Sequence, residues 1–283
     1  MTHVHSLTLT VITPVLNGER FSSGCLDSVL AQGCAEVEHL VVDGGSTDST
    51  ESIVRERAAE HASIRWLQEQ GANQSHAMNL GVDAAFGRIV GILNVDDFYE
   101  PGVLPRVVDL FRDLPRPALA VGNCNTWESD TLLYVNRPAE LRFEKLLLGP
   151  DLHPFPFNPS AYFYDRSLHD LVGGYDERDE FSMDLDFLLR AVRAANAVYV
   201  DETWGNYRVH PEAKTARDRQ AGAHDARRDA VLRRYRRLLP PRERARHYAE
   251  LGLRTSQRRA RRARWRLGTA LAARRERRAG SPS

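Results

Sequence analysis

The sequence predicts an α/β fold, a mainly parallel sheet flanked by helices with a helical C-terminal extension. Over the first 114 residues, short β-branched runs alternate with amphipathic helical patterns, as expected of βαβ units. A chain of 283 residues with 42% hydrophobic content can bury the core of such a sheet. From Pro241 onward the chain carries 14 Arg, no Lys and three Glu, so a body of net charge −10 precedes a tail of net charge +11.

The N-terminal half alternates strand and helix without interruption. Runs rich in Val, Ile, Leu and Thr predict strands over Leu7–Thr13, Val37–Val42, Ile64–Leu67 and Arg88–Leu93. Apolar residues at helical spacing predict helices over Phe21–Gln32, Ser49–Ala62, Ser75–Phe86 and Gly102–Leu114, the last entered through Pro101.

The pattern after Leu114 is looser and ends in long helices. Strands are expected at Leu119–Asn123, Leu132–Val135 and Ala161–Tyr164, and helices at Glu140–Leu147 and, capped by Ser182, at Ser182–Ala195. Two helical stretches, Ala216–Leu239 and Arg242–Arg278, finish the chain. We therefore expect a domain over residues 1–215, with halves 1–114 and 115–215, and a basic helical extension over 216–283.

Polar residues follow three of the predicted strands. Ligands of open parallel sheets bind at the carboxyl ends of the strands, which places residues 13–15, 43–45 and 94–97 along one rim. In VVDGGSTDST, Asp43 can accept a hydrogen bond from a ligand N–H such as the imide of uracil, while the glycines admit the ligand. The structural alternative is a Gly-Gly turn with Ser46 or Asp48 capping the next helix.

The stretch GILNVDDFYE carries a buried strand into two adjacent carboxylates, Asp96 and Asp97. Such a pair resists burial unless a positive group lies nearby. Helix capping explains one aspartate, but not the pair together with Asn94. Oxygen ligands at a strand end suit Mg²⁺ or Mn²⁺, which commonly bridges to a diphosphate. The stretch therefore predicts a divalent metal site.

Seven motifs together resemble the family 2 glycosyltransferases, which are inverting enzymes with the Rossmann-like GT-A fold. They are TVITPVLN, VVDGGSTDST, HAMNLG, GILNVDDFYEP, GGYDE, MDLDFLLRA and YRVHPEAKT, in order from about Leu7 to Thr215. The resemblance implies transfer of a sugar from a nucleotide diphosphate donor, most simply a UDP-sugar, to a hydroxyl of a glycan, lipid-linked or small-molecule acceptor.

The resemblance also implies roles for individual residues. The nucleotide-sugar would be bound by Thr13, Pro14, Val15, Asp43, Gly44, His76, Asn79, Asn94, Val95 and Asp96. The metal, Mn²⁺ or Mg²⁺, would be held by Asp96, the metal-binding aspartate of the family, with Asp97 and His210. Asn94 stands in place of the first Asp of that motif, and Met183 and the loop around Gly71 also depart from the family pattern.

Asp184 matches the catalytic base of the family. Inverting transfer needs one base to take the proton of the acceptor hydroxyl. Asp184 and Asp186 point about 200° apart on a helix, so only one faces the site. Asp184 lies nearer the helix start, where the dipole favours the ionised form.

The sequence is also compatible with two rival functions. A sugar nucleotidyltransferase would need a Gly-rich, basic triphosphate loop where this chain has TPVLNGER, and an inactive nucleotide-sugar-binding or scaffold protein is the non-enzyme alternative. With neither a membrane span nor a signal peptide in the sequence, we expect a cytoplasmic protein with free thiols. The Arg-rich tail fits an anionic membrane surface at the inner face of the membrane, or a solvated helix packed on the acidic body, or a disordered tail; nucleic acid is not expected.

Overall fold

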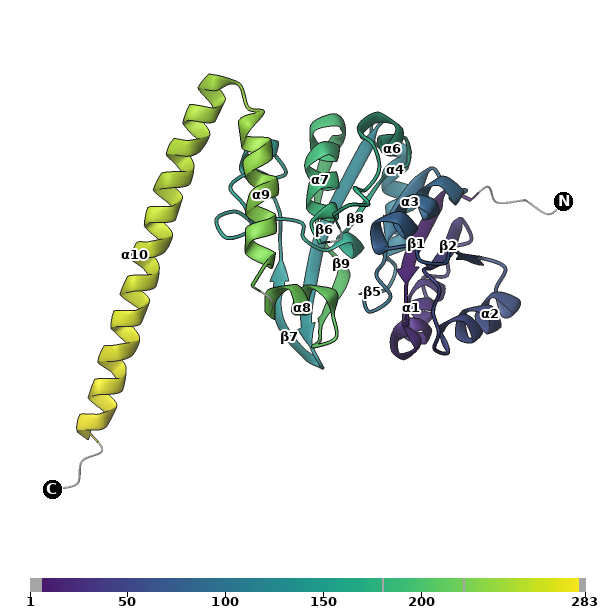
Figure 1. The fold of residues 1–283 in the computed structure, drawn as a ribbon, viewed down its shortest axis with the longest axis horizontal. Helices are drawn as coiled ribbons and strands as arrows, with labels where there is room; N and C mark the ends of the chain where they lie inside the picture. Colours follow the sequence, from purple (N-terminus) through teal and green to yellow (C-terminus); the bar gives the residue numbers. More distant parts are fainter. Residues whose placement is uncertain (1–6, 180, 221, 280–283) are drawn as a thin grey trace.

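A computed structural model describes residues 7–179, 181–220 and 222–279 and shows a mixed α/β body with a long C-terminal helix (Figure 1). In the described residues the strands form one sheet in the order β3-β2-β1-β4-β8-β6-β9-β5, and β7 pairs with β6. The fold class predicted from the sequence is confirmed.

The N-terminal half is a parallel sheet, as its strand and helix alternation predicts. Strands β1, β2 and β4 lie side by side and in parallel, and β3 extends the sheet beyond β2. Its strands are β1 (Leu9–Val15), β2 (Val37–Asp43), β3 (Ile64–Gln68) and β4 (Ile89–Ile92). Its helices are α1 (Glu19–Leu30), α2 (Thr50–Glu60), α3 (Gln74–Ala84) and α4 (Val103–Asp113).

The second half adds antiparallel pairs to the sheet. Strand β8 is antiparallel to both β4 and β6, whereas β9 runs parallel to β6. The elements are β5 (Phe98–Tyr99), β6 (Ala118–Glu128), β7 (Thr131–Asn136), α5 (Phe143–Leu146), the 3₁₀ turn η1 (Pro159–Ala161), β8 (Tyr162–Asp165), α6 (Ser167–Val172), α7 (Met183–Ala194) and β9 (Asn196–Val209).

Several expectations for this half need correction. Strand β9 has 14 residues and was not predicted from the sequence, and the helix expected at Glu140–Leu147 is only the short α5. Ser182 stands at the N-cap of α7, but its side chain makes no capping hydrogen bond. The apolar run of β9 is short, Ala197–Val200, and is followed by the polar residues Asp201, Glu202 and Thr203, so the sequence does not mark a strand of this length.

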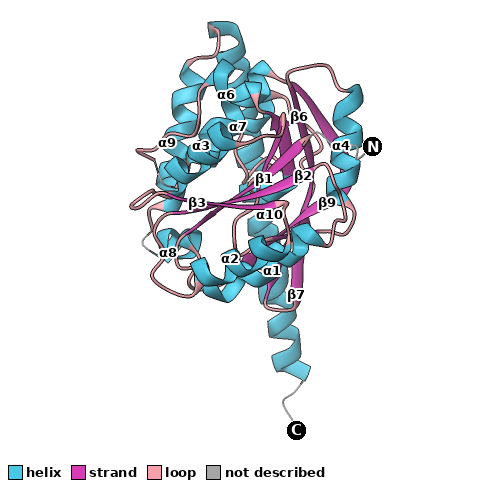
Figure 2. Ribbon diagram, turned by 90° about the vertical axis from the view of Figure 1, so that its right-hand side faces the viewer, coloured by secondary structure: helices cyan, strands magenta, loops and turns pink. Residues whose placement is uncertain are grey.

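Helices cover both faces of the sheet (Figure 2). Ile12, Leu40 and Ile92 point to the face covered by α3 and α7, where Met78 and Phe187 complete one apolar core. Leu9 and Val11 point to the opposite face, where α1 and α4 pack with Trp204. The alternation along each strand therefore distinguishes the two layers.

The C-terminal helices begin as part of the body. The predicted helix Ala216–Leu239 is split into α8 (Lys214–Gln220) and α9 (His224–Arg237), with Gly222 between them at φ +71°. Val231, Leu232 and Tyr235 of α9 are buried in the core beside α7. The last helix, α10 (Pro241–Ala279), lies beyond α9 and continues past the edge of the body (Figure 1).

Ion pairs attach the first part of α10 to the body. Glu250 lies 2.6 Å from Lys145, and Arg258 lies 2.6 Å from Asp151. Arg254 also donates to the backbone carbonyl of Leu152. This part of the tail therefore packs on the acidic body.

Candidate functional site

The three strand tips singled out in the sequence lie along one edge of the sheet. β1 lies between β2 and β4 and runs parallel to both, so their carboxyl ends are neighbours. Pro14 and Val15 are buried at the tip of β1. The side chain of Thr13 points into the protein, where its hydroxyl lies 2.9 Å from Nε2 of the buried His39.

Asp43 at the tip of β2 stabilises its own turn. Its Oδ1 accepts hydrogen bonds from the backbone N–H of Gly45 at 3.2 Å and from the hydroxyl of Ser46 at 2.6 Å. The backbone of Gly44 passes close to the loop before α3, because a Cβ there would lie 2.6 Å from the carbonyl oxygen of Ala72. Both residues thus have a structural role at the position where the resemblance places the nucleotide base.

The loops after β1 and β2 are hydrogen-bonded to each other. The backbone N–H of Asn17 donates to Ser46 Oγ, and Asn17 Oδ1 accepts from the backbone of Thr47, both at 2.8 Å. Glu19 and Asp48 each accept from the other loop as well. We name residues 17–19 and 46–50 the paired loops.

Asp97 is directed inward at the tip of β4. It is fully buried, and its carboxylate accepts from Asn158 Nδ2 at 2.8 Å, from the backbone N–H of Arg208 at 3.1 Å and from Asn94 Nδ2 at 3.3 Å. Burial, and then the charge of Asp96, raise the pKa of Asp97 well above its ordinary value, while the three donors oppose that shift.

Asp96 is directed toward the loop that follows β9. Its Oδ2 lies 2.9 Å from Nε2 of His210, and Arg208 Nη1 donates to its backbone carbonyl at 3.2 Å. The guanidinium of Arg208 also lies over the ring of Phe98. The adjacent aspartates therefore face different partners, although the charge of Asp96 still raises the pKa of Asp97.

The predicted metal ligands are brought together only in part. The described residues hold no group of three or more His, Cys, Asp or Glu that could bind a metal ion, so Asp96, Asp97 and His210 do not form the three-residue group expected from the sequence. Asp96 and His210 do fit a cation, since they pair a half-buried carboxylate with an imidazole. The buried Nδ1 of His210 has no hydrogen-bond partner among the described residues.

His76 and Asn79 of α3 hold a neighbouring loop. His76 Nδ1 lies 3.1 Å from Glu177 Oε2, and Asn79 bonds both Glu177 Oε1 and the backbone N–H and carbonyl of Tyr175. Hydrogen bonds from Asn79 and His76 lower the pKa of Glu177. His76 and Asn79, which the sequence predicts to contact the nucleotide-sugar, position the segment Gly173–Glu177 in this structure.

Asp184 stands in the first turn of α7 without a hydrogen bond to one oxygen. Its Oδ1 is inaccessible to solvent and has no partner in the described part of the chain. Burial raises the pKa of Asp184 to about 6, against a smaller opposing effect of Lys214. The charge of Asp184 in turn raises the pKa of Tyr162 on β8, after burial.

Asp186 faces away from the site, as the helical spacing predicts. It accepts hydrogen bonds from Arg190, Arg234 and Tyr235 and so joins α7 to α9. The structure thus separates a carboxylate with structural partners from one, Asp184, that retains a bare oxygen.

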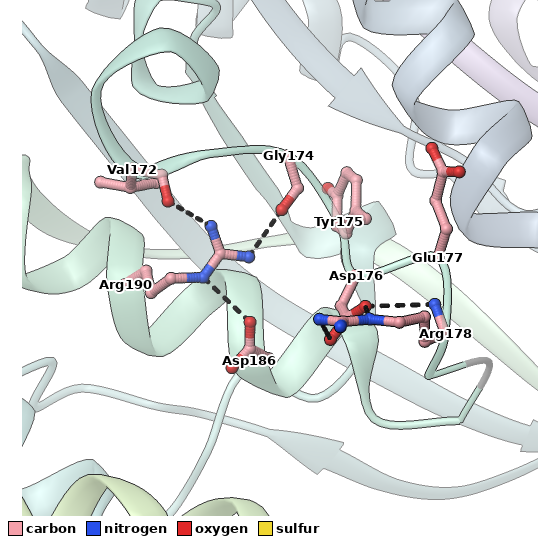
Figure 3. Close-up of a pocket in the computed structure, with 8 residues that line it drawn as sticks. All are labelled: Val172, Gly174, Tyr175, Asp176, Glu177, Arg178, Asp186 and Arg190. Carbon is pink, nitrogen blue, oxygen red and sulfur yellow. Dashed lines mark hydrogen bonds and ion pairs between the residues drawn. The ribbon is translucent and has the colours of Figure 1, made fainter.

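An open pocket of about 540 Å³ lies between α7 and the Gly173–Glu177 segment. Figure 3 shows Arg190 at its wall, donating to the backbone carbonyls of Val172 and Gly174 and to Asp186. Arg178 pairs with Asp176 on the other side. The charged side chains at its wall already have partners: Arg190 with Asp186, Arg178 with Asp176, and Glu177 with His76.

Two contributors to the site were missed in the sequence. Asn158 ends the Pro-rich loop GPDLHPFPFN, where Asn before Pro and Ser signalled only a turn. Gln74 bridges Asn94 at 3.0 Å and Lys214 at 3.3 Å, and so joins the tip of β4 to the residues near Asp184. Both contacts connect segments far apart in the chain, and neither leaves a local pattern.

A model of the family described as Glycosyl transferase family 2 matches residues 10–171, which is more than half of the chain. The chain belongs to glycosyl transferase family 2. The match ends before Asp184, β9 and His210, so it covers most of the first half of the domain and part of the second. The resemblance stated from the motifs is therefore confirmed.

Curated relatives of this family 2 member are glycosyltransferases. EpsJ of Bacillus subtilis (strain 168), an uncharacterized glycosyltransferase, is 28% identical over 220 residues, covering 73% of this chain and 62% of EpsJ. A PGL/p-HBAD biosynthesis glycosyltransferase of Mycobacterium bovis is 31% identical over 189 residues, covering 64% of this chain and 68% of the relative. A chondroitin synthase of Escherichia coli is 27% identical over 207 residues, covering 72% of this chain and 29% of the synthase. The chain thus spans less than two thirds of EpsJ and of the synthase.

Solved structures share the GT-A fold. Residues 1–349 of S. aureus TarS in complex with UDP match with a TM-score of 0.60 at 20% identity, covering 80% of this chain and 69% of that chain. The mannosyltransferase PcManGT from Pyrobaculum calidifontis, in complex with GDP-Man and Mn²⁺, matches with a TM-score of 0.57 at 22% identity, covering 94% and 80%. The described residues include no helix long and apolar enough to cross a membrane.

Proposed function

We propose that this protein is an inverting glycosyltransferase that moves a sugar from a nucleotide diphosphate donor, a UDP-sugar, to an acceptor hydroxyl, with Asp184 as the general base. The observation that carries the proposal is the state of Asp184, which has a pKa of about 6 and a buried oxygen without a partner. A carboxylate whose pKa lies just below the working pH is mostly ionised and can still bind a proton during the reaction.

The donor would bind along the rim formed by the tips of β1, β2 and β4. Among the described residues, Oδ2 of Asp43 accepts only from the backbone N–H of Ser46, at 3.2 Å, and its remaining lone pair supports a role toward an imide N–H. The binding of UDP by TarS and of GDP-Man by PcManGT supports a nucleotide donor of this class.

Asp96 and His210 would hold a divalent cation, Mn²⁺ or Mg²⁺, together with diphosphate oxygens. Such an ion supplies charge stabilisation to a departing diphosphate. The Mn²⁺ in the PcManGT complex supports this proposal. Asp97 would keep the turn rigid, because its carboxylate accepts hydrogen bonds from Asn94, from Asn158 and from the backbone N–H of Arg208.

The acceptor hydroxyl would approach Asp184, lose its proton to the carboxylate, and attack the anomeric carbon from the side opposite the diphosphate. The bond from that carbon to the diphosphate would break, and the nucleoside diphosphate would leave. Lys214, bonded to Gln74, would limit the rise in the pKa of the base. An anionic membrane surface is a proposed partner of the Arg-rich end of α10, whose sequence continues beyond the part attached to the body.

The decisive experiment replaces Asp184 by Asn and measures both turnover and donor binding. Turnover should fall by at least about 10²-fold because the base is lost, while UDP in the presence of Mn²⁺ should still raise the unfolding temperature. Asp83→Asn, at an exposed position on α3, is the control and should leave both unchanged.

Other outcomes point to the rival functions. Unchanged turnover in Asp184→Asn would remove the base assignment. UDP binding without turnover in the unaltered protein, over a panel of nucleotide sugars and acceptors, would favour an inactive binding protein. Release of diphosphate from a nucleoside triphosphate and a sugar phosphate would favour a nucleotidyltransferase.

A further inference from the structure

A row of three aromatic rings lies beside the candidate site. Tyr134 of β7 and Phe157 of the Pro-rich loop have ring centroids 6.5 Å apart, and Phe157 lies edge-on to Tyr207 of β9 at 5.8 Å. Tyr134 is 52% exposed, and the other two rings are half-buried. We name these three residues the aromatic row.

Strand register places the row on one face of the sheet. Thr126 of β6 is paired with Tyr134 on one side and with Tyr207 on the other, so all three side chains point the same way. Phe157 also packs against the core that contains α7. The residues of the opposite face, Trp127 and Asn206, bond each other instead.

Two residues of the row are next in sequence to residues that bind Asp97. Phe157 precedes Asn158, which donates to Asp97, and Tyr207 precedes Arg208, whose backbone N–H donates to the same carboxylate. The row therefore begins next to the Asp96–Asp97 turn and extends outward to the exposed Tyr134. Beneath it, the hydroxyl of Thr126 is buried and has no hydrogen-bond partner among the described residues.

We propose that the aromatic row binds the acceptor by stacking against the pyranose ring of a glycan. A pyranose has apolar C–H faces and a rim of hydroxyls, and Tyr134 and Tyr207 offer an apolar face with a polar tip. An acyl chain would instead leave the two phenol groups facing hydrocarbon. The proposal rests on the proposed function, since it names the substrate class for the acceptor side of that site.

Trp127 and Trp204 do not belong to the aromatic row. Trp204 is buried in the core under α4. Trp127 points to the other face of the sheet and donates to Asn206.

The test compares Tyr134→Ala with Leu132→Ala. Leu132 lies on the same strand and is 44% exposed, but it is paired with Trp127 and so points to the opposite face. Saturation-transfer NMR would be recorded with the methyl α- and β-pyranosides of glucose, galactose, mannose and N-acetylglucosamine, with UDP and Mn²⁺ present. Phe157→Leu, which keeps the packing volume but removes the aromatic ring, is a second test variant.

We expect at least one pyranoside to receive saturation at its ring C–H protons in the unaltered protein and in Leu132→Ala. Its affinity should fall by about tenfold in Tyr134→Ala and in Phe157→Leu. Binding of no pyranoside, or equal binding in Tyr134→Ala and Leu132→Ala, would overturn the proposal. A third outcome would also overturn it. If Tyr134→Ala and Leu132→Ala equally weaken binding of the protein to vesicles of phosphatidylcholine and phosphatidylglycerol, the hairpin of β6 and β7 binds a membrane instead.

Failure of this proposal is distinguishable from failure of the proposed function. If the row does not bind the acceptor, its variants still bind UDP and retain turnover that depends on Asp184. If the proposed function is wrong, neither UDP binding nor that turnover is found in the unaltered protein.

Discussion

Burial raises the pKa of both Asp97 and Asp184, yet the surroundings of the two carboxylates differ. Asp97 accepts from three donors, which fix it in place. Asp184 has an oxygen with no donor at all in the described residues. A carboxylate with satisfied oxygens has a structural role, whereas one with a bare oxygen near neutral pH can exchange a proton.

The pKa of about 6 at Asp184 predicts the pH dependence of activity. A base must be ionised, so kcat/KM should rise about tenfold per pH unit below 6 and level off above it. Steady-state rates measured from pH 4.5 to 8 test this expectation. A profile that is flat across pH 6 would contradict it.

The same pKa predicts an opposite trend in stability, which serves as an internal control. Because the folded protein holds this proton more tightly than the unfolded chain, Asp184 contributes stability at low pH that is lost as the pH rises from about 3.8 to about 6. As the pH rises over this interval, the unfolding temperature of the unaltered protein should therefore fall relative to that of Asp184→Asn. An unchanging difference would indicate that the pKa is ordinary.

At the scale of elements, α3 and the Gly173–Glu177 segment form one unit. The side chain of Asn79 hydrogen-bonds both the backbone N–H and the backbone carbonyl of Tyr175. Asn73, at the N-cap of α3, donates to the carbonyl of Glu177. Gly174 allows the close approach, since a Cβ there would lie 2.5 Å from Asn79 Oδ1. The segment is therefore positioned by a helix about 100 residues earlier in the chain.

Gly174→Ala should separate this segment from α3. The added methyl displaces Asn79 and leaves the backbone groups of Tyr175 without partners, at a cost of about 1–3 kcal/mol. Chemical unfolding measures the cost, and hydrogen exchange should rise at residues 173–177. Gly252→Ala is the matched control, because a Cβ there meets nothing within 4 Å; a cost as small as that of the control would contradict the argument.

The elements also show what a sequence can predict. β1, β2 and β4 were predicted because each is a buried apolar run whose ends are marked by Gly, Pro or Asp. β9 was not, since its residues are mostly polar or half-buried and their pairing depends on β6, some 80 residues away. The strand tips could be placed from local patterns, but Asn158 and Gln74 join the site through contacts between distant segments.

At the scale of the whole molecule, the acidic body and the basic tail meet along the first part of α10. From the sequence, we expect the domain to end at residue 215 and the extension to begin at residue 216. Because Val231, Leu232 and Tyr235 of α9 belong to the core, we propose that the extension begins instead at Pro241. A helix of 39 residues is about 58 Å long, so α10 reaches well beyond its points of attachment.

Removing those attachments should release α10 without unfolding the body. In Asp151→Asn with Glu250→Gln, hydrogen exchange should increase over residues 241–258. The unfolding free energy should fall by no more than about 1 kcal/mol per pair, since these groups are partly exposed. Glu243→Gln, at an exposed position of the same helix, is the control. Unchanged exchange in the double variant would mean that the ion pairs do not hold the helix.

The paired loops after β1 and β2 have a consequence for how this protein can diverge. Each loop satisfies backbone groups of the other, through Asn17, Ser46 and Asp48 among others. A graft or recombination event that imports one loop alone would leave several amides of its neighbour without acceptors. Residues 17–19 and 46–50 are therefore expected to be inherited and exchanged together, and a chimaera should tolerate both replacements better than either one.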